Sequence, residues 1–318
     1  MVSLNLVFVV IFVMKYMIVN GWIYGMANGL SMNYYLMTCP TADIIIRNAV
    51  QTALQSDPTF AAGLVRMHFH DCFVQGCDGS VLINSTKSNM VEKDSPANLS
   101  LRGYEIIDAA KEELERQCPG VVSCADIVAM AARDAVFLAS GPFYEIPKGR
   151  RDGTRSKIED TINLPSPTLN SSQLITLFGN RGFTAQDMVA LSGAHTLGVA
   201  RCSSFKSRLD AADPTIETSF AKTLSKTCAT GDDAEQPFDS TRNTFDTDYF
   251  SALQRRAGVL FSDQTLFESA ATRGLVNKYA FNRALFNMDF QRAMIKMGQL
   301  DVKEGSEGEI RSNCRIIN

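Results

Sequence analysis

The three histidines of this 318-residue chain are its candidates for moving protons: His68, His70 and His195. Arg66 and His70 stand four residues apart, so on a helix they share one face, with Phe69 beside them. A base next to a fixed cation suits a reaction that moves a proton while negative charge develops. His68 and His70 point to different sides of such a helix, which argues against a metal chelate. The alternative is a salt-bridging arginine beside a buried structural histidine.

The residues after His70 form a second cluster, rich in oxygen ligands and in turn-forming glycines. Its members are Asp71, Val74, Gly76, Asp78 and Ser80. Carboxylates, a hydroxyl and exposed carbonyls are the hard oxygen ligands that calcium takes, six to eight at a time. Cys72 and Cys77 lie inside this stretch and are close enough to form a disulfide that holds it. The cluster predicts a calcium site, with an ordinary polar turn as the alternative.

Helical patterns dominate the segments that must position these residues, and alternating β patterns are scarce. Ile46, Val50 and Leu54 follow Thr41 at helical spacing, so Thr41 is expected to cap a helix. The stretch from Arg66 to Cys72 is expected to be helical as well. Further helices are expected at 102–117, 123–138, 172–179, 184–191, 247–257, 269–279 and 282–297. No segment resembles a flexible linker, so we expect one mainly α domain over residues 28–318.

The first 27 residues differ from the rest. Leu4 to Met14 is apolar apart from Asn5 and is shorter than the roughly 20 residues that span a bilayer. Its length is typical of a secretory signal peptide, and Gly25-Met26-Ala27 has the small residues of a cleavage site. We therefore expect residues 1–27 to be cleaved, with a retained anchor as the alternative. The only tryptophan, Trp22, would be lost with them.

Composition limits the function classes. Hydrophobic residues make up 45% and charged residues 20%, so the chain can bury a core and is not disordered. The net charge of −3 argues against a nucleic-acid partner, which would require a basic surplus. Eight cysteines predict a disulfide framework in an oxidising compartment. They allow 105 pairings, among which the sequence alone does not choose.

The stretch from Arg66 to Ser80 resembles the distal helix and first calcium loop of the secretory plant haem peroxidases (class III). The resemblance continues to the end of the chain, in motifs at 92–93, 98, 100–104, 122–127, 149–153, 191–198, 261–264 and 313–315. It implies a mainly α haem-peroxidase fold with little β structure. In that fold two helical halves sandwich one haem b, and four disulfides hold the chain.

The resemblance also implies roles for the pocket. His195 would be the axial ligand of the haem iron, with Asp263 bonded to its other ring nitrogen. His70 would move the proton of hydrogen peroxide, and Arg66 would stabilise the charge that develops. Asn98 would keep His70 basic. Three further residues complete the implied set, with Phe69 closing the pocket to bulky donors, Pro165 beside the exposed haem edge, and Glu92 linking the pocket to calcium.

Two calcium ions are implied. The first would use Asp71, Val74, Gly76, Asp78 and Ser80, with Glu92 linked. The second would use Thr196, Asp239, Thr241, Thr244 and Asp246. Many relatives separate the two acids by eight positions, with a Thr-Pro pair between them, whereas here Asp239 and Asp246 are seven positions apart with no proline between them. The middle ligands therefore stay open, and a capped turn before the next helix is the alternative.

The family pattern pairs the cysteines as Cys39–Cys118, Cys72–Cys77, Cys124–Cys314 and Cys202–Cys228. Three N-x-Ser/Thr sequons occur, of which Asn84 and Asn170 are expected to carry glycans and Asn98, if it serves His70, is not. Tyr144 stands where many relatives have tryptophan. The other tyrosines and phenylalanines are expected to be core residues.

The resemblance implies a secreted, monomeric enzyme of the cell wall. It would reduce hydrogen peroxide and oxidise small phenolic donors in one-electron steps, in wall cross-linking, lignification or oxidative stress. No stable membrane association is expected. Two other readings are open: a wall-associated binding protein with an inactive haem pocket, and a zinc enzyme that uses the histidines directly. Three histidines spread in this way do not form a zinc site easily.

Overall fold

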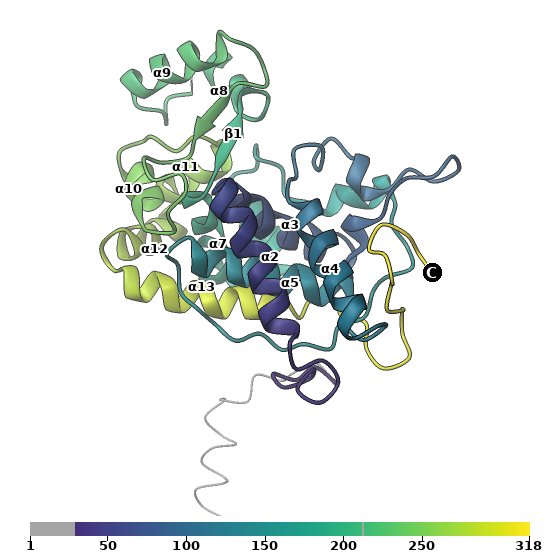
Figure 1. The fold of residues 1–318 in the computed structure, drawn as a ribbon. Helices are drawn as coiled ribbons and strands as arrows, with labels where there is room; N and C mark the ends of the chain where they lie inside the picture. The colour runs from purple at the N-terminus through teal and green to yellow at the C-terminus, as the bar shows by residue number, and fades with distance from the viewer. Residues whose placement is uncertain (1–28, 212) are drawn as a thin grey trace, which may run out of the picture.

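The computed structural model describes residues 29–211 and 213–318, and these form a mainly helical fold, as predicted (Figure 1). Sheet structure in this part of the chain is limited to one antiparallel pair, β1 (Val199–Arg201) and β2 (Glu235–Pro237). Val199 lies opposite Pro237 in this pair. The predicted signal peptide, residues 1–27 with Trp22, lies outside the described residues.

A first helical half is built around α5 (Cys124–Leu138). The helices α2 (Ala42–Ser56) and α3 (Phe60–Gln75) both pack against it, and α4 (Tyr104–Gln117) packs against α2 and α5. Every residue of α5 from Cys124 to Val136 is buried. Its many alanines explain this, because small side chains let the neighbouring helices approach closely.

A second helical half contains α6 (Ser171–Gly179), α7 (Ala185–Ser192), α10 (Asp248–Gln254), α11 (Phe261–Glu268), α12 (Ala270–Phe281) and α13 (Arg283–Met297). The helix α7 lies against α12 and α13, while α10 and α11 lie against α12. Aromatic rings fill its centre, with Phe245, Phe250 and Phe290 all packed on Phe286. The two halves meet in more than one place, and one of these is where α3 lies against the short 3-10 turn η4 (Gly193–Thr196).

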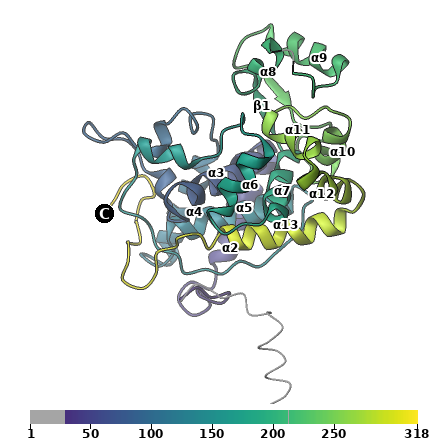
Figure 2. The same cartoon turned by 180° about the vertical axis from the view of Figure 1, so that it is seen from behind.

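A small lobe stands apart from both halves and protrudes in both views (Figures 1 and 2). It holds α8 (Lys206–Asp210), α9 (Thr218–Cys228) and the β1–β2 pair, with its own apolar cluster around Phe205 and Leu224. Neither α9 nor α11 was predicted. In α9 the apolar residues Phe220, Leu224 and Cys228 stand at the four-residue helical spacing and pack into this cluster, so the signal was present but rests on three positions in a polar segment.

The remaining short turns are η1 (Ser80–Leu82), η2 (Glu92–Asp94), η3 (Ile158–Asn163) and η5 (Cys202–Ser204). Helix ends partly follow the predictions. Ser123 caps α5 by accepting a hydrogen bond from the Asp126 amide at 3.1 Å, and Asn170 and Thr184 form capping boxes. The helix α2 begins directly after Thr41, as predicted, but the Thr41 hydroxyl donates to Gln117 Oε1 and makes no capping hydrogen bond.

Four disulfides bind the described chain, and they join the cysteines that the family pattern pairs. Cys39–Cys118 connects the start of α2 to the end of α4, and Cys202–Cys228 closes the small lobe. Cys72–Cys77 lies at the end of α3. Cys124–Cys314 joins α5 to the C-terminal segment, which leaves α13 and runs to the side of α4 (Figure 2).

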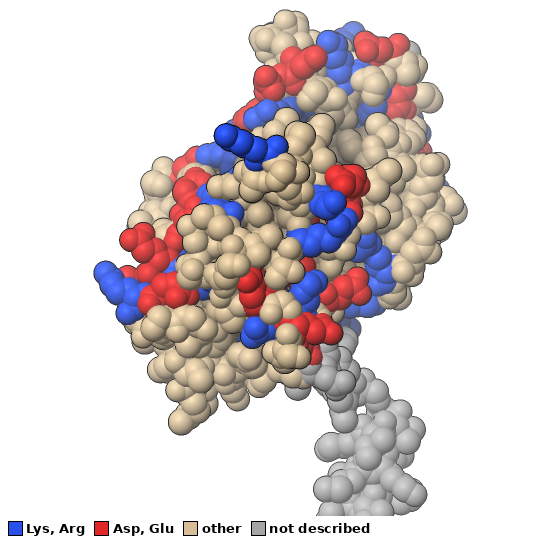
Figure 3. Space-filling model, turned by 90° about the vertical axis from the view of Figure 1, so that its right-hand side faces the viewer, with Lys and Arg blue, Asp and Glu red and all other residues tan. Residues whose placement is uncertain are grey.

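The surface carries a mixture of charges. On the face drawn in Figure 3, basic and acidic side chains are interspersed, and neither sign covers the face. This agrees with the small net charge of −3. Among the described residues, none of the helices combines the length and the apolar character needed to cross a bilayer.

Candidate active site

The helix α3 brings Arg66 and His70 together as their spacing predicts. Arg66 Nε donates to His70 Nε2 at 3.1 Å. The other two nitrogens of the guanidinium donate to Ser100 Oγ at 2.9 Å and to the Ala97 carbonyl at 2.7 Å. The segment before α4 therefore holds Arg66 as a fixed cation beside His70, which is what the stabilisation of a developing negative charge requires.

His70 is buried, and its protonation follows from its neighbours. Its Nδ1 lies 2.5 Å from Asn98 Oδ1, while Asn98 Nδ2 donates to the Glu92 carbonyl at 2.7 Å. Because the amide nitrogen of Asn98 is used there, its oxygen must accept from Nδ1–H, and Nε2 carries the lone pair. Burial, and then the charge of Arg66, lower the pKa of His70 to about 3. His70 is therefore a neutral base at Nε2.

Glu92 connects His70 to the loop at 71–80. Its carbonyl accepts from Asn98, and its carboxylate oxygen Oε2 accepts from Ser80 Oγ at 3.2 Å. The second oxygen, Oε1, is buried and takes no hydrogen bond from the described residues. Burial, and then the nearby Asp71 and Asp78, raise the pKa of Glu92 to about 9. A carboxylate in this position lacks a cationic partner.

The loop itself gathers buried oxygen atoms. Asp71 accepts from the Gly79 amide at 3.0 Å, and Asp78 accepts from the Ser80 amide at 3.1 Å. Burial, and then Asp78, raise the pKa of Asp71 to about 8. Gly76 has a φ of 99°, and a Cβ there would lie 2.5 Å from the Asp301 carbonyl, so this turn requires glycine. The loop concentrates negative charge where a cation would relieve it.

His195 and Asp263 meet although 68 positions separate them. His195 lies on η4 and Asp263 on α11, and Nδ1 of the histidine is 2.8 Å from Asp263 Oδ1. Asp263 is 2% exposed, whereas the His195 side chain is 38% exposed. No hydrogen bond to a described residue occupies Nε2 of His195. A histidine with Nδ1–H on a carboxylate and an open Nε2 is the arrangement of a metal-ligating imidazole.

Two aromatic residues that sequence reasoning treated as core complete this side of the site. The Phe238 ring stacks on the His195 ring, with centroids 4.4 Å apart and an interplanar angle of 3°. Tyr249 Oη donates to Asp263 Oδ1 at 2.8 Å. No local pattern distinguishes these positions from other buried aromatics. The packing of α10 against η4 reveals Tyr249, and the stacking on His195 reveals Phe238, which follows β2.

The second loop also brings acids and hydroxyls together. Thr196 Oγ1 donates to Asp239 Oδ2 at 2.7 Å and lies 3.2 Å from Asp246 Oδ1. Thr241 donates to Asp239 Oδ1 through its amide and its hydroxyl, and the Thr244 amide donates to the Thr241 carbonyl. Side chains of Thr196, Asp239, Thr241 and Asp246 thus converge, and Thr244 joins them through the backbone turn.

Comparison with known proteins shows the family of this chain. The peroxidase family model matches residues 46–282. The chain is 70% identical to Peroxidase 47 of Arabidopsis thaliana over 92% of this chain and 90% of that protein. It is 47% identical to Peroxidase 64 of Arabidopsis thaliana (99% and 98% covered) and 48% identical to Peroxidase 5 of Vitis vinifera (91% and 92%).

The chain belongs to the class III plant peroxidase family. It is therefore an enzyme, which decides against the binding-protein and zinc-enzyme readings. Membership implies haem as the cofactor and hydrogen peroxide as the oxidising substrate. In the described part of this peroxidase no group of three or more His, Cys, Asp or Glu side chains is placed as metal ligands. The two acidic loops instead mix carboxylates with hydroxyls and backbone oxygens.

The two apolar residues of the predicted site are Phe69 and Pro165. Phe69 is half-buried, with its ring 5.7 Å from that of His70 and packed on Phe73 at 4.4 Å. Pro165 is half-buried in the loop after η3. Their positions allow the predicted roles at the pocket wall and rim, which remain predictions.

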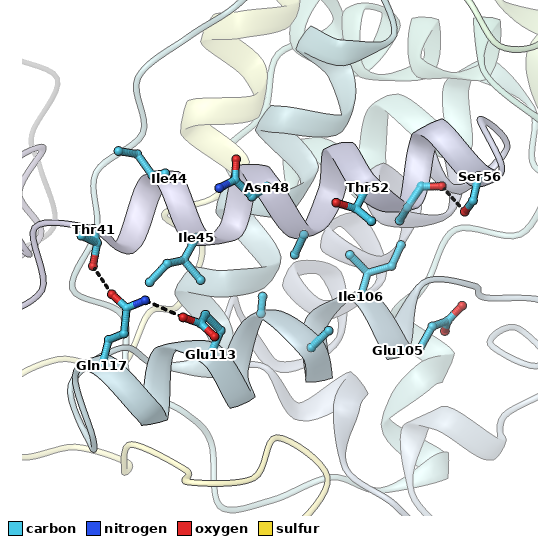
Figure 4. Close-up of a pocket in the computed structure, with 14 residues that line it drawn as sticks. Thr41, Ile44, Ile45, Asn48, Thr52, Ser56, Glu105, Ile106, Glu113 and Gln117 are labelled. Atoms are coloured by element: carbon cyan, nitrogen blue, oxygen red, sulfur yellow. Dashed lines mark hydrogen bonds between the residues drawn. The ribbon is translucent and has the colours of Figure 1, made fainter.

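A groove of about 700 Å³ lies elsewhere on the peroxidase, between α2 and α4 (Figure 4). Ile44 and Ile45 of α2 line it with Ile106 of α4, and Gln117 bridges Thr41 and Glu113 at one end. None of the predicted site residues lines this groove. It is a surface feature of the first helical half and has no part in the pocket.

Proposed function

We propose that this peroxidase is a secreted enzyme that reduces hydrogen peroxide and oxidises small phenolic donors in one-electron steps. One observation carries the proposal. His70, with its lone pair at Nε2, and His195, bonded to Asp263, lie on α3 and η4, which contact each other across the two helical halves. One half thus supplies a base and the other a metal ligand.

The residues on the two elements fit a haem b. His195 would hold the iron through Nε2, since Nδ1 is taken by Asp263 and the ring is 38% exposed. When bound, haem supplies the redox chemistry that peroxide reduction and donor oxidation require. The carboxylate of Asp263 makes the imidazole a more basic ligand.

The distal residues would handle the proton and the charge of peroxide. His70 accepts a peroxide proton at Nε2 and returns it to the departing oxygen, while Asn98 fixes the tautomer throughout. Arg66 stabilises the negative charge that builds on that oxygen. Phe69 narrows the pocket, so phenolic donors are expected at the rim near Pro165. Roles in wall cross-linking, lignification and oxidative stress belong to the same proposal.

The variant His70→Ala tests the proposal. We expect its rate of reaction with peroxide to fall by about 10²–10⁴, the usual scale for loss of general acid–base catalysis. His68→Gln is the matched control, since His68 lies two residues away on α3 and makes no hydrogen bond to Arg66 or Asn98. Stopped-flow spectroscopy at the Soret band measures both. A wild-type rate in His70→Ala would disprove the acid–base role.

Two calcium ions are part of the proposal. The first would bind at Asp71, Val74, Gly76, Asp78 and Ser80, and the second at Thr196, Asp239, Thr241, Thr244 and Asp246. The orphaned, buried oxygen of Glu92 and the raised pKa of Asp71 support a cation at the first loop. Elemental analysis of the purified enzyme should find two calcium ions per chain, and an enzyme without calcium would remove both sites.

Secretion of a monomer over residues 28–318 is likewise proposed, after cleavage of 1–27. Asn84 and Asn170 are exposed and suit glycosylation, and Asn170 caps α6 through Oδ1, which leaves Nδ2 free. Asn98 is 1% exposed and bonded to His70. N-terminal sequencing should start at Asn28, and glycopeptide mass spectrometry should find glycans at Asn84 and Asn170. A glycan on Asn98 would contradict its role.

A further inference from the structure

A single oxygen of the Asp263 carboxylate accepts two hydrogen bonds. His195 Nδ1 and Tyr249 Oη both lie 2.8 Å from Oδ1. The other oxygen, Oδ2, is buried and takes no hydrogen bond from any described residue. The negative charge that Asp263 offers to His195 is therefore shared with a phenol.

Tyr249 is built into the same junction of helices. It lies on α10, which contacts both α11, the helix of Asp263, and η4, the turn of His195. Its side chain is 1% exposed, and its ring meets the His195 ring edge-on, with centroids 6.1 Å apart at 80°. Burial, and then the charge of Asp263, raise the pKa of Tyr249 well above its usual value, so the phenol keeps its proton and donates.

We propose that Tyr249 is a positioning residue that acts through Asp263 and limits how strongly the imidazole of His195 donates electrons to iron. A hydrogen bond to the charged form of a carboxylate lowers its basicity. With Tyr249 in place, Asp263 therefore accepts a weaker hydrogen bond from Nδ1–H of His195. The inference rests on the proposed function, since it requires His195 to ligate haem.

The sign of the effect follows from the charge. Without the phenol, Asp263 takes more of the Nδ1 proton, His195 becomes more like imidazolate, and ferric iron is favoured over ferrous. The ferric/ferrous reduction potential then falls, and the iron–histidine bond strengthens. A purely structural role predicts the opposite, because Asp263 would move away from His195 and the histidine would become a weaker donor.

The test compares Tyr249→Phe with wild-type holoenzyme. We expect a lower reduction potential by spectroelectrochemical titration, and a higher iron–histidine stretching frequency by resonance Raman spectroscopy of the ferrous form. Tyr279→Phe is the matched control, because Tyr279 is equally buried and donates to Asp289 Oδ2 at 2.8 Å rather than to Asp263. It should leave both values at those of the wild type.

A double-mutant cycle locates the effect. In an Asp263→Asn background, Tyr249→Phe should produce no further shift in potential, because the carboxylate through which it acts is gone. Incorporation of 3-fluorotyrosine at position 249 preserves the shape of the side chain and strengthens the donor, so the potential should rise. This second substitution keeps the test decisive even if Tyr249→Phe loses haem.

An unchanged or raised potential in Tyr249→Phe, or an unchanged or lowered one with fluorotyrosine at 249, would overturn the inference. The same preparations separate it from the proposed function. If the wild-type chain takes up no haem and shows no Soret band, the proposed function fails. If the chain binds haem and turns over peroxide, but substitutions at position 249 leave its reduction potential unchanged, only the inference fails.

Discussion

Two histidines two residues apart on α3 have different surroundings. His70 faces Arg66 and Asn98, while His68 is 3% exposed with Nδ1 at 3.5 Å from Cys72 Sγ. Burial, and then the charge of Arg150, lower the pKa of His68 to about 3. A helix turns 200° in two residues, which explains why neighbours of the same type differ. His68 is a neutral packing residue of the first half.

This buried neutral histidine should make stability depend on pH. In the unfolded chain its pKa is about 6.5, so between roughly pH 6.5 and 3 the unfolded state binds a proton that the folded state does not. Its stabilising contribution is present above pH 6.5 and is lost as the pH falls, by up to about 1.4 kcal/mol per pH unit. Urea unfolding between pH 4 and 7 should show a shallower slope for His68→Gln than for wild type. Equal slopes would contradict the assignment.

The C-terminal segment holds the loop at 71–80 in place through Arg311. Cys314 is bonded to Cys124 at the start of α5. Arg311, which is fully buried, donates to the Gly79 carbonyl at 2.6 Å and to the Cys314 carbonyl at 2.8 Å. The last residues of the chain are thus tied to a loop that lies more than 200 positions earlier.

Removal of the Cys124–Cys314 disulfide should lower the free energy of unfolding more than removal of Cys202–Cys228 does. Cys124–Cys314 spans 190 positions and Cys202–Cys228 spans 26. The chain-entropy model gives about 5 and about 3.5 kcal/mol for these loops. Denaturant unfolding of the two double Cys→Ala variants should rank them in this order. An equal or reversed loss would show that strain or residual structure, rather than loop closure, sets the effect.

At the scale of the molecule, each helical half has one acidic loop beside its part of the pocket. The loop at 71–80 begins in the last turn of α3, which carries His70, and continues to η1. The loop at 239–246 precedes α10, which carries Tyr249. Thr196, adjacent to His195, bonds into the second loop. Calcium in both loops would therefore brace both sides of the pocket.

Chelation of calcium should lower the melting temperature and open both loops. A ligand present at 100 times its Kd stabilises the folded state by about 2.7 kcal/mol per site. Hydrogen exchange should quicken at 71–98 and 239–246 after EGTA treatment, and calcium should restore protection. Asp239→Asn is the control that should affect the second loop alone. A chelated, calcium-free enzyme with an unchanged melting temperature would refute the bracing role.

Local sequence determined the parts of this protein that depend on neighbours along the chain. Helical periodicity predicted most helices of both halves, and the spacing of Arg66 and His70 predicted their shared face, because a helix repeats within four residues. The predicted starts of two helices, at Ser123 and Thr184, coincide with residues that cap α5 and α7 in the structure. The helix α9 was missed although Phe220, Leu224 and Cys228 repeat every four residues, because three apolar positions in a polar segment make a short repeat.

Tertiary structure alone decided what depends on contacts across the chain. Asp263 was linked to His195 only by family motif, since no spacing rule reaches across 68 positions, and the geometry brings the two within 2.8 Å. The selection of four disulfides among 105 pairings has the same origin. Tyr249 looked like any buried aromatic until α10 was placed against η4 and α11. Sequence specifies local conformation through short-range sterics, whereas the meeting of the two helical halves creates the site.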